Sequence, residues 1–212
     1  MINIRIHKNK IKQENSMKKI SLSIVLLLLA STAFSQTWVT DPAHSRLGFS
    51  ITHLMISHVT GNFKQFEIKA VTAKPDYSDA KIEVTAQIAS INTDVEQRDT
   101  HLKSPDFFDA QKFSSLVFKS TSLKNTKGNE YKLTGNLTMH GITKVVVLDV
   151  TFEGKVPNPM NKKDIAVFTI KGLLKRSDFG IGTKFPAAMV GDEVTINATA
   201  ELSPVGWKQT EK

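Results

Sequence analysis

The chain has 212 residues, of which 40% are hydrophobic and 8% aromatic, with no cysteine and a formal net charge of +8. This length suffices for one domain with a sizeable core. The lack of cysteine excludes disulfide bonds and a lipidated N-terminal cysteine. Residues 1–35 hold six Lys or Arg and one Glu, so the remaining 22 basic and 19 acidic residues give only +3. Such a small charge gives little support for a nucleic-acid-binding protein.

The N-terminal segment has the pattern of a secretory signal peptide. A Lys-Lys pair precedes an apolar run over residues 20–30, and Ala33 and Ser35 are the small residues expected at a cleavage site. The run is shorter than the ~20 residues that a membrane-spanning helix needs. We therefore predict that residues 1–35 are removed after Ser35, and that the product is periplasmic or secreted. Met17 is an alternative start of translation.

From Thr37 onward apolar and polar residues alternate with a period of two, which is typical of strands with one buried face. Eight antiparallel strands in sequence order predict an all-β fold, an elongated up-and-down, lipocalin-like barrel over residues 36–204, because closure removes exposed sheet edges. Residues 205–212 would form a C-terminal tail. The eight stretches cover residues 47–53, 61–70, 82–88, 116–120, 131–139, 145–152, 166–170 and 194–200.

An outer-membrane barrel, with its apolar face outward, is the alternative architecture. The low aromatic content argues against it, because such barrels carry aromatic girdles at both interfaces. Lysines on the polar face of several strands argue against it as well. These lysines are Lys69, Lys81, Lys119, Lys132 and Lys171.

One segment, Asn92–Asp109, interrupts the strand pattern. Asp94 has the side chain of a helix N-cap, and Gln97 stands where a capping box places its second member. Pro105 forces the residue before it out of helical geometry. We predict a short helix over residues 95–103, with the adjacent Phe107-Phe108 pair placed so that the segment covers one end of the barrel.

An eight-stranded barrel is wide enough to hold its own side chains or one small ligand. Small residues recur on the predicted inner face: Ala70, Ala86, Ser120, Gly135, Ala198 and Ala200. They either fit against bulky partners across a solid core or leave a tubular apolar cavity, and the pattern leaves both interpretations open. If the barrel is hollow, the predicted wall consists of Phe49, Phe66, Ile82, Val84, Phe118, Leu137, Leu148 and Phe168.

The polar residues contain no recognisable catalytic or metal-binding motif. The histidines lack the close spacing of zinc ligands, and no G-x-S-x-G motif, phosphate loop or dinucleotide fingerprint is present. We therefore predict no catalytic residue, no metal site and no cofactor. Charged residues do gather on the predicted helix and in the later KRSDFGIG loop, and two of them are Arg98 and Arg176. They form either a salt-bridge cluster that fixes the helix or contacts to a polar headgroup at the barrel mouth.

Four blocks of the sequence, in order, resemble the YceI-like family of polyisoprenoid-binding periplasmic proteins. The blocks are DPAHSRLGFSITHLMISHVTGNFKQF, IASINTDVEQRDTHLKSPDFFDAQKFSSLVFKS, LTGNLTMHGITKVVVLDV and LKRSDFGIGTKFPAAMVGDEV. The resemblance spans residues 38–202 and implies an extended lipocalin-like barrel that binds a long isoprenoid chain without catalysis. His53 and Phe179 match signature positions, and with Arg98, His101 and Arg176 they complete the predicted mouth.

The predicted function is therefore that of an exported, non-enzymatic protein that holds a polyisoprenoid, a quinone-like molecule or another long-chain lipid for transport, storage or stress protection. Two alternatives remain. One is a hydrolase- or isomerase-type enzyme that uses His101 or His140 as a base in the same cavity. The other is a surface-interaction or stress protein with a filled core. We predict no nucleic-acid partner and no membrane-spanning segment, and leave the identity of the lipid and a homodimer open.

Overall fold

The computed structural model describes residues 35–205. The predicted signal peptide, the alternative start at Met17 and nearly all of the predicted tail lie outside these residues. The elements in chain order are β1 (Gln36–Thr40), β2 (Arg46–His53), β3 (Ser57–Phe63), β4 (Phe66–Thr72), β5 (Lys81–Gln87), the 3₁₀ helix η1 (Ile88–Ser90), β6 (Ile91–Asn92), α2 (Glu96–Lys103), β7 (Ser115–Lys127), β8 (Glu130–Met139), β9 (Ile142–Pro157), β10 (Asp164–Lys175), the 3₁₀ helix η2 (Arg176–Phe179) and β11 (Val190–Pro204).

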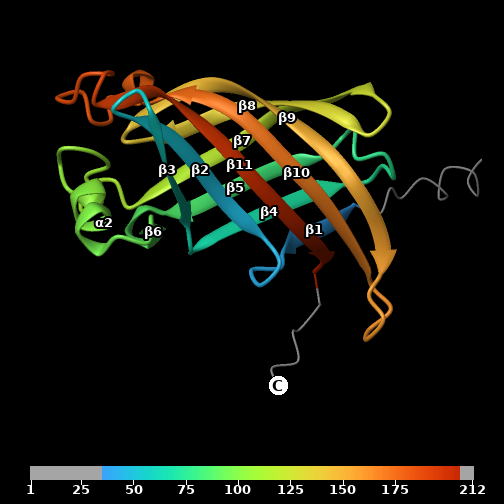
Figure 1. Ribbon diagram of the computed structural model, residues 1–212. Helices are drawn as coiled ribbons and strands as arrows, with labels where there is room; N and C mark the ends of the chain where they lie inside the picture. The colour runs from blue at the N-terminus through green and yellow to red at the C-terminus, as the bar shows by residue number, and fades with distance from the viewer. Residues whose placement is uncertain (1–34, 206–212) are drawn as a thin grey trace, which may run out of the picture. The chain divides into compact units, whose positions relative to one another are not determined.

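The strands form one antiparallel sheet that closes on itself (Figure 1). Its ring runs β1-β4-β5-β7-β8-β9-β10-β11 and returns to β1. The second half of β11 pairs with β1, whereas the first half pairs with β2, which pairs in turn with β3. The predicted class, an all-β up-and-down barrel of eight antiparallel chain segments with one short helix, is therefore confirmed.

Three of the eight segments are divided, and one of these divisions, at Lys64 and Gln65, falls inside the stretch 61–70 that was predicted as one strand. β1 and β2 are separated by residues 41–45, β3 and β4 by Lys64 and Gln65, and β5 and β6 by η1. The prediction that Gly61 opens a strand is wrong, because Gly61 lies inside β3 and pairs with Phe49. Each division lets the wall bend while its two halves stay in the same sheet.

Large side chains of the barrel wall lie against glycines on the neighbouring strands. The ring of Phe49 covers Gly61, the ring of Phe118 covers Gly135, and a methyl group of Leu148 covers Gly172. A Cβ added to any of these glycines would lie less than 3.0 Å from the covering side chain. The missing side chains thus let two phenyl rings and one leucine lie along the sheet instead of projecting into the barrel.

The helical segment forms as predicted but begins differently. α2 ends before Pro105, as expected, with Ser104 as its C-cap. The predicted N-cap is wrong: Asp94 has a φ of 62°, Val95 takes the N-cap position, and no side chain caps the helix. Asp94 instead accepts a hydrogen bond from the Asn92 side chain at 2.9 Å. No helix within residues 35–205 is long and apolar enough to cross a membrane.

The glycine contacts predict a difference between two alanine substitutions. Gly135→Ala places a methyl group against both the Phe118 ring and the backbone oxygen of Lys119, which cannot move without shifting β7. It should lower the free energy of unfolding by about 1–3 kcal/mol. In Gly172→Ala the only atom closer than 3.4 Å to the added methyl group is the flexible end of Leu148, so this variant should cost less. Urea unfolding measures the free energy of unfolding of both variants. An equal loss in the two would contradict the conclusion that the backbone contact of Gly135 makes it the less tolerant position.

Candidate functional site

A cavity of about 480 Å³ occupies the barrel interior. Its volume falls within the roughly 300–1,000 Å³ of small-molecule sites. Aliphatic and aromatic side chains make up nearly all of the lining. The charged and imidazole side chains that border it are His53, Arg98, His101, Lys175 and Arg176. The barrel is therefore hollow, which decides between the two interpretations of its small inward residues.

Seven of the eight residues predicted for the wall border this cavity: Phe49, Ile82, Val84, Phe118, Leu137, Leu148 and Phe168. Phe66 does not. It is the first residue of β4, directly after the break that separates β4 from β3, and its half-buried ring packs among the buried side chains instead. The alternation placed these residues on the inner face, but it could not locate the break beside Phe66.

One end of the cavity is closed by the loop over residues 73–80. Tyr77, in the middle of this loop, is 9% exposed, and its ring lies 5.4 Å from the rings of both Phe152 and Phe168. The loop is fixed by Asp79, whose carboxylate accepts hydrogen bonds from the Thr72 hydroxyl and from backbone N–H groups. Burial raises the pKa of the Tyr77 hydroxyl. Lining residues at this end are buried, so the cavity is blind here.

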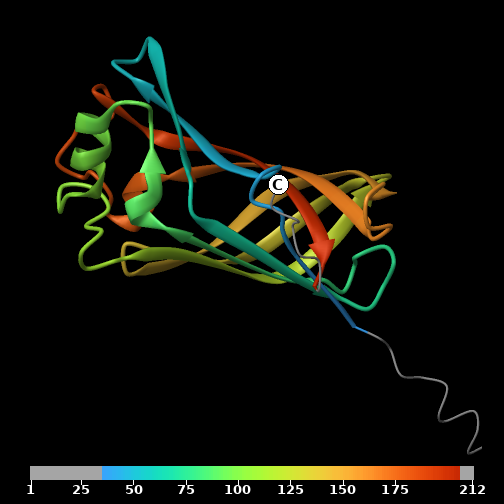
Figure 2. The ribbon, with the colours of Figure 1, turned by 90° about the horizontal axis from the view of Figure 1, so that it is seen from below.

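The opposite end, called the mouth below, carries α2, η2 and the loop over residues 180–189 (Figure 2). Here the lining residues reach the surface: His101 has a side chain 49% exposed and Met189 is 48% exposed. The cavity is thus a pocket with one buried end and one end that communicates with solvent.

Two loops meet across the mouth and are joined by three contacts. The rings of Phe107 and Phe185 stack with centroids 4.9 Å apart, and His101 contacts both rings edge-on. Lys184 donates a hydrogen bond to Asp106 at 2.6 Å, which holds the pKa of that carboxyl below its usual value. We call α2 with residues 104–113 the lid. The lid is fixed to the 180–189 loop mainly by its aromatic rings, because an exposed ion pair contributes little.

Arg176 was predicted as a headgroup ligand, but its guanidinium hydrogen-bonds to backbone carbonyl groups instead. It is 7% exposed and donates five hydrogen bonds, to the carbonyl oxygens of Ile181, Gly182, Phe185, Val190 and Gly191. These bonds use all five donors of the side chain. Arg176 therefore shapes the 180–191 segment and has no donor left for a ligand.

Phe179 lies outside the cavity lining, although it was predicted at the mouth. Its side chain is 1% exposed, and its carbonyl oxygen accepts a hydrogen bond from His140 Nδ1 at 3.0 Å. His140 also contacts the ring of Phe113, and it does not border the cavity. This excludes His140 from acting on a molecule in the cavity, and it gives both residues a structural role beneath the mouth.

Arg98, also at the mouth, has a guanidinium nitrogen whose hydrogen-bond donors are unused within residues 35–205. Its Nε donates to Thr93 Oγ1 at 2.7 Å and its Nη2 to the Thr93 carbonyl at 2.8 Å. Asp99, 9% exposed, accepts hydrogen bonds from the backbone N–H and hydroxyl of Thr93. Within residues 35–205, Nη1 of Arg98 makes no hydrogen bond. Thr93 and Asp99 thus hold a half-buried guanidinium at the cavity with one nitrogen unused.

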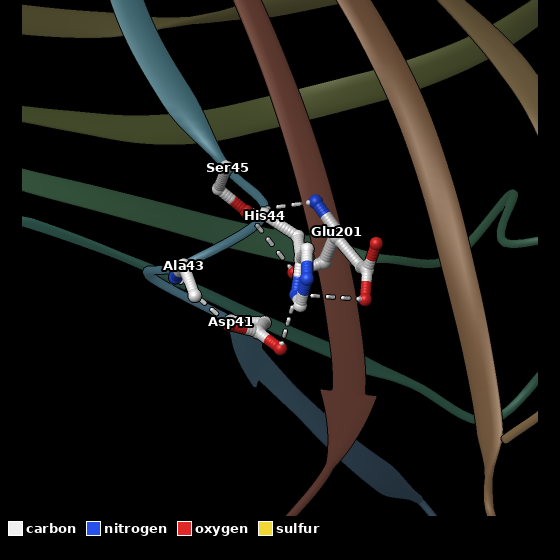
Figure 3. A network of polar contacts seen from close by, with 5 residues as sticks. All are labelled: Asp41, Ala43, His44, Ser45 and Glu201. Carbon is white, nitrogen blue, oxygen red and sulfur yellow. Dashed lines mark hydrogen bonds and ion pairs between the residues drawn. The ribbon is translucent and has the colours of Figure 1, made fainter. Parts of the chain in front are cut away.

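A second polar cluster lies on the outside of the barrel, where the β1–β2 connection passes β11 (Figure 3). His44 Nδ1 lies 3.0 Å from Asp41 Oδ2 and 3.7 Å from Glu201 Oε1. The three ligand atoms lie within 4.8 Å of one another, a spacing that could hold a metal ion. The hydrogen bond and charge of Asp41, with the charge of Glu201, raise the pKa of His44. A protonated His44 between these two carboxylates forms ion pairs that hold the β1–β2 connection against β11. We call Asp41, His44 and Glu201 the seam cluster and these ion pairs the clamp.

Residues 38–202 match the YceI-like domain family. The chain belongs to the YceI-like family. A UPF0312 protein of Staphylococcus aureus is 38% identical over 167 residues, which are 77% of this chain and 95% of that protein. The YCEI protein of Campylobacter jejuni that crystallizes with large solvent channels is 36% identical, with a TM-score of 0.64 over 77% of this chain and 95% of that one.

A more distant solved structure shares the fold. It is a polyisoprenoid binding domain from Saccharophagus degradans, implicated in plant cell wall breakdown, that is 13% identical and has a TM-score of 0.58 over 80% of this chain and 99% of that chain. At this identity the likeness extends to the barrel alone.

Sequence reasoning missed two residues that shape the cavity of this YceI-like chain. Tyr77 was part of a predicted turn, and Phe185 was not singled out. Each is one large aromatic residue within a short polar or small-residue loop, KPDYSD and TKFPAA. A bulky ring at such a place is costly to leave in water, which is the signal that could have identified both.

The seam cluster predicts a pH dependence of stability. Because the folded pKa of His44 is raised above its ordinary value of 6.5, the imidazolium stabilises the fold fully below 6.5 and the effect is lost as pH rises through the raised pKa. The melting temperature should therefore fall as the pH rises above 6.5, and His44→Gln should remove this change. The control is His58→Gln, since no ion pair found within residues 35–205 involves His58. An unchanged slope in His44→Gln would contradict the clamp.

Proposed function

We propose that this chain is an exported, non-enzymatic carrier or store that holds a long apolar lipid, such as an isoprenoid or a quinone-like molecule, in the barrel. The observation that carries the proposal is the 480 Å³ apolar cavity with one blind end. The fold is shared with a solved polyisoprenoid binding domain, which supports the same ligand class. Export rests on the sequence pattern of residues 1–35.

Burial of the ligand chain supplies the affinity in this proposal. Each methylene group moved from water into the cavity contributes about 0.8 kcal/mol. Ten such groups would contribute about 8 kcal/mol before the cost of immobilising the ligand is subtracted. The blind end accepts only hydrocarbon, because Tyr77 and its aromatic neighbours close it. The polar end of the ligand then lies at the mouth, near Arg98 and His101.

Neither alternative function has comparable support. A filled core is incompatible with the cavity. An enzyme would need a base inside it, and of the two proposed bases only His101 borders the lumen. His101 Nε2 lies 3.6 Å from Asp106 Oδ2, and its ring packs edge-on against both of the stacked phenyl rings of the mouth. These contacts make His101 part of the lid.

Organic extraction and mass spectrometry of the purified chain test the proposal, with Ala198→Trp as the decisive variant. Ala198 borders the cavity in the middle of β11, so an indole there should fill the lumen and lower the bound lipid at least ~10-fold. Val145→Trp is the matched control. Val145 is 69% exposed on the outer face of β9, so this variant should retain the lipid. Val84→Phe replaces Ala198→Trp if that variant does not fold. Wild-type protein without lipid, or full loading of folded Ala198→Trp, would refute the proposal.

The lid contacts predict how fast the ligand leaves. Phe185→Ala removes the stack on Phe107 and the edge contact with His101, and an aromatic pair contributes about 0.5–1.5 kcal/mol. The two contacts together contribute about 1–3 kcal/mol, so lipid release should be at least ~5-fold faster. Lys184→Ala breaks only the exposed ion pair with Asp106 and should change the rate less. Stopped-flow release of a fluorescent isoprenoid measures both rates. Faster release from Lys184→Ala than from Phe185→Ala would mean that the ion pair, and not the ring stack, holds the lid closed.

A further inference from the structure

The hairpin between β2 and β3 ends in a solvent-exposed apolar tip, which we define as Leu54, Met55 and Ile56. Their side chains are 50%, 73% and 88% exposed. Leu54 and Met55 have φ angles of 50° and 62°, and the Ile56 N–H donates to the His53 carbonyl at 3.3 Å. Positive φ at both central residues of a β-turn is the pattern that Asn-Gly sequences favour, and bulky residues at these angles are outliers. The loop has three residues, since His53 pairs with Ser57. The chain thus exposes three large apolar side chains, two of them on residues in an unfavourable backbone conformation.

The tip adjoins the mouth of the cavity. The Leu54 N–H donates to the Met189 carbonyl at 3.0 Å, which ties the hairpin to the 180–189 loop. Met189 is itself 48% exposed and borders the cavity, as does His53 at the base of the tip. Figures 1 and 2 both show the β2–β3 hairpin at the end of the barrel that carries α2. Apolar surface therefore continues from the tip, over Met189, into the lumen.

We infer that this tip inserts into the hydrocarbon layer of a lipid bilayer, so that the ligand passes between membrane and cavity along the apolar surface. The inference rests on the proposed function and gives its membrane contact. A long apolar chain that crossed water would lose the burial that drives its binding, and a continuous apolar path avoids this loss.

The chemistry of the tip fits a bilayer better than a protein partner. Its three residues are apolar and uncharged, whereas the hot spots of protein interfaces are enriched in Trp, Tyr and Arg, and Leu is under-represented there. The adjacent helix α2 carries Glu96 and Asp99 against Arg98 and Lys103, so its formal charges balance and an anionic surface gains no net attraction from it. Binding should therefore occur on zwitterionic vesicles and depend little on salt.

A label at the tip tests insertion directly. The chain has no cysteine, so a single introduced cysteine can be labelled without further changes. The full chain carrying Met55→Cys is coupled to an environment-sensitive fluorophore and mixed with phosphatidylcholine vesicles. Its emission should shift to the blue, and quenching by iodide should fall at least ~5-fold. Met160→Cys is the matched control, because Met160 is 77% exposed in the β9–β10 turn at the far end of the barrel, and it should remain quenched.

Equal protection at both positions, or none at position 55, would overturn the inference. Protection at position 55 that appears without vesicles and rises with protein concentration would assign the tip to a second copy of the chain and overturn it as well.

The variant Leu54→Asn/Met55→Gly separates docking from binding. It replaces two of the three tip residues, Leu54 and Met55, with residues that suit this turn, so the hairpin should keep its structure. Uptake of a pyrene-labelled polyprenol from phosphatidylcholine vesicles should slow at least ~10-fold, while the amount bound from detergent solution stays at the wild-type level. Uptake at the wild-type rate would refute the docking role. If wild type binds no polyprenol even from detergent, the proposed function fails, and the label at position 55 still decides whether the tip meets the bilayer.

Discussion

The close approach of large side chains to glycines on neighbouring strands is the interaction on which the hollow barrel depends. An eight-stranded barrel is narrow enough for ordinary inward side chains to fill it. Here Phe49, Phe118 and Leu148 lie over Gly61, Gly135 and Gly172. Their volume is spread along the wall, and the axis of the barrel stays open. The apolar lining, the 480 Å³ cavity and the proposed ligand all depend on this arrangement.

The two ends of the barrel differ, and the difference gives the cavity a direction. At the blind end Tyr77 packs edge-on against Trp38 and Phe168, while Asp79 fixes the backbone of its loop. At the mouth the lid meets the 180–189 loop through one ring stack, the edge-on contact of His101 with Phe185 and an exposed ion pair. Few buried contacts hold the mouth, so it is the end that can open at the lower cost in free energy. A ligand would enter there with its apolar end first.

The sequence pattern correctly predicted the features that depend on neighbouring residues in the chain, namely the strands, their inner face and the end of α2. Alternation identified the barrel and the inner face because every second residue of a wall strand must be apolar, and Pro105 ended α2 because it excludes helical geometry before it. Features set by individual side-chain contacts and backbone irregularities could not be predicted. Asp94 adopts a positive φ instead of capping the helix. A bulge beside Thr121 shifts the register of β7, so that Leu123 also faces inward.

The candidate site was predicted less completely than the fold for the same reason. Arg98 and Arg176 look equivalent in the sequence, since each is a basic residue beside an aspartate near the barrel end. Their roles separate only when the 180–191 segment folds over Arg176 and supplies five carbonyl acceptors. No alternation or spacing encodes that wrapping. The residue types were correct, but which guanidinium remains available depends on tertiary structure.

This separation of the two arginines also bears on ligand selection in a carrier of the proposed kind. A hydrogen bond to a charged group contributes about 1.5–3 kcal/mol, whereas ten buried methylene groups contribute about 8 kcal/mol. The hydrocarbon chain therefore determines whether a ligand binds, and Arg98 Nη1 can only favour ligands whose polar end carries an oxygen acceptor. Such a site accepts many long-chain lipids and orients them all alike, with the hydrocarbon against Tyr77 and the polar end beneath the lid.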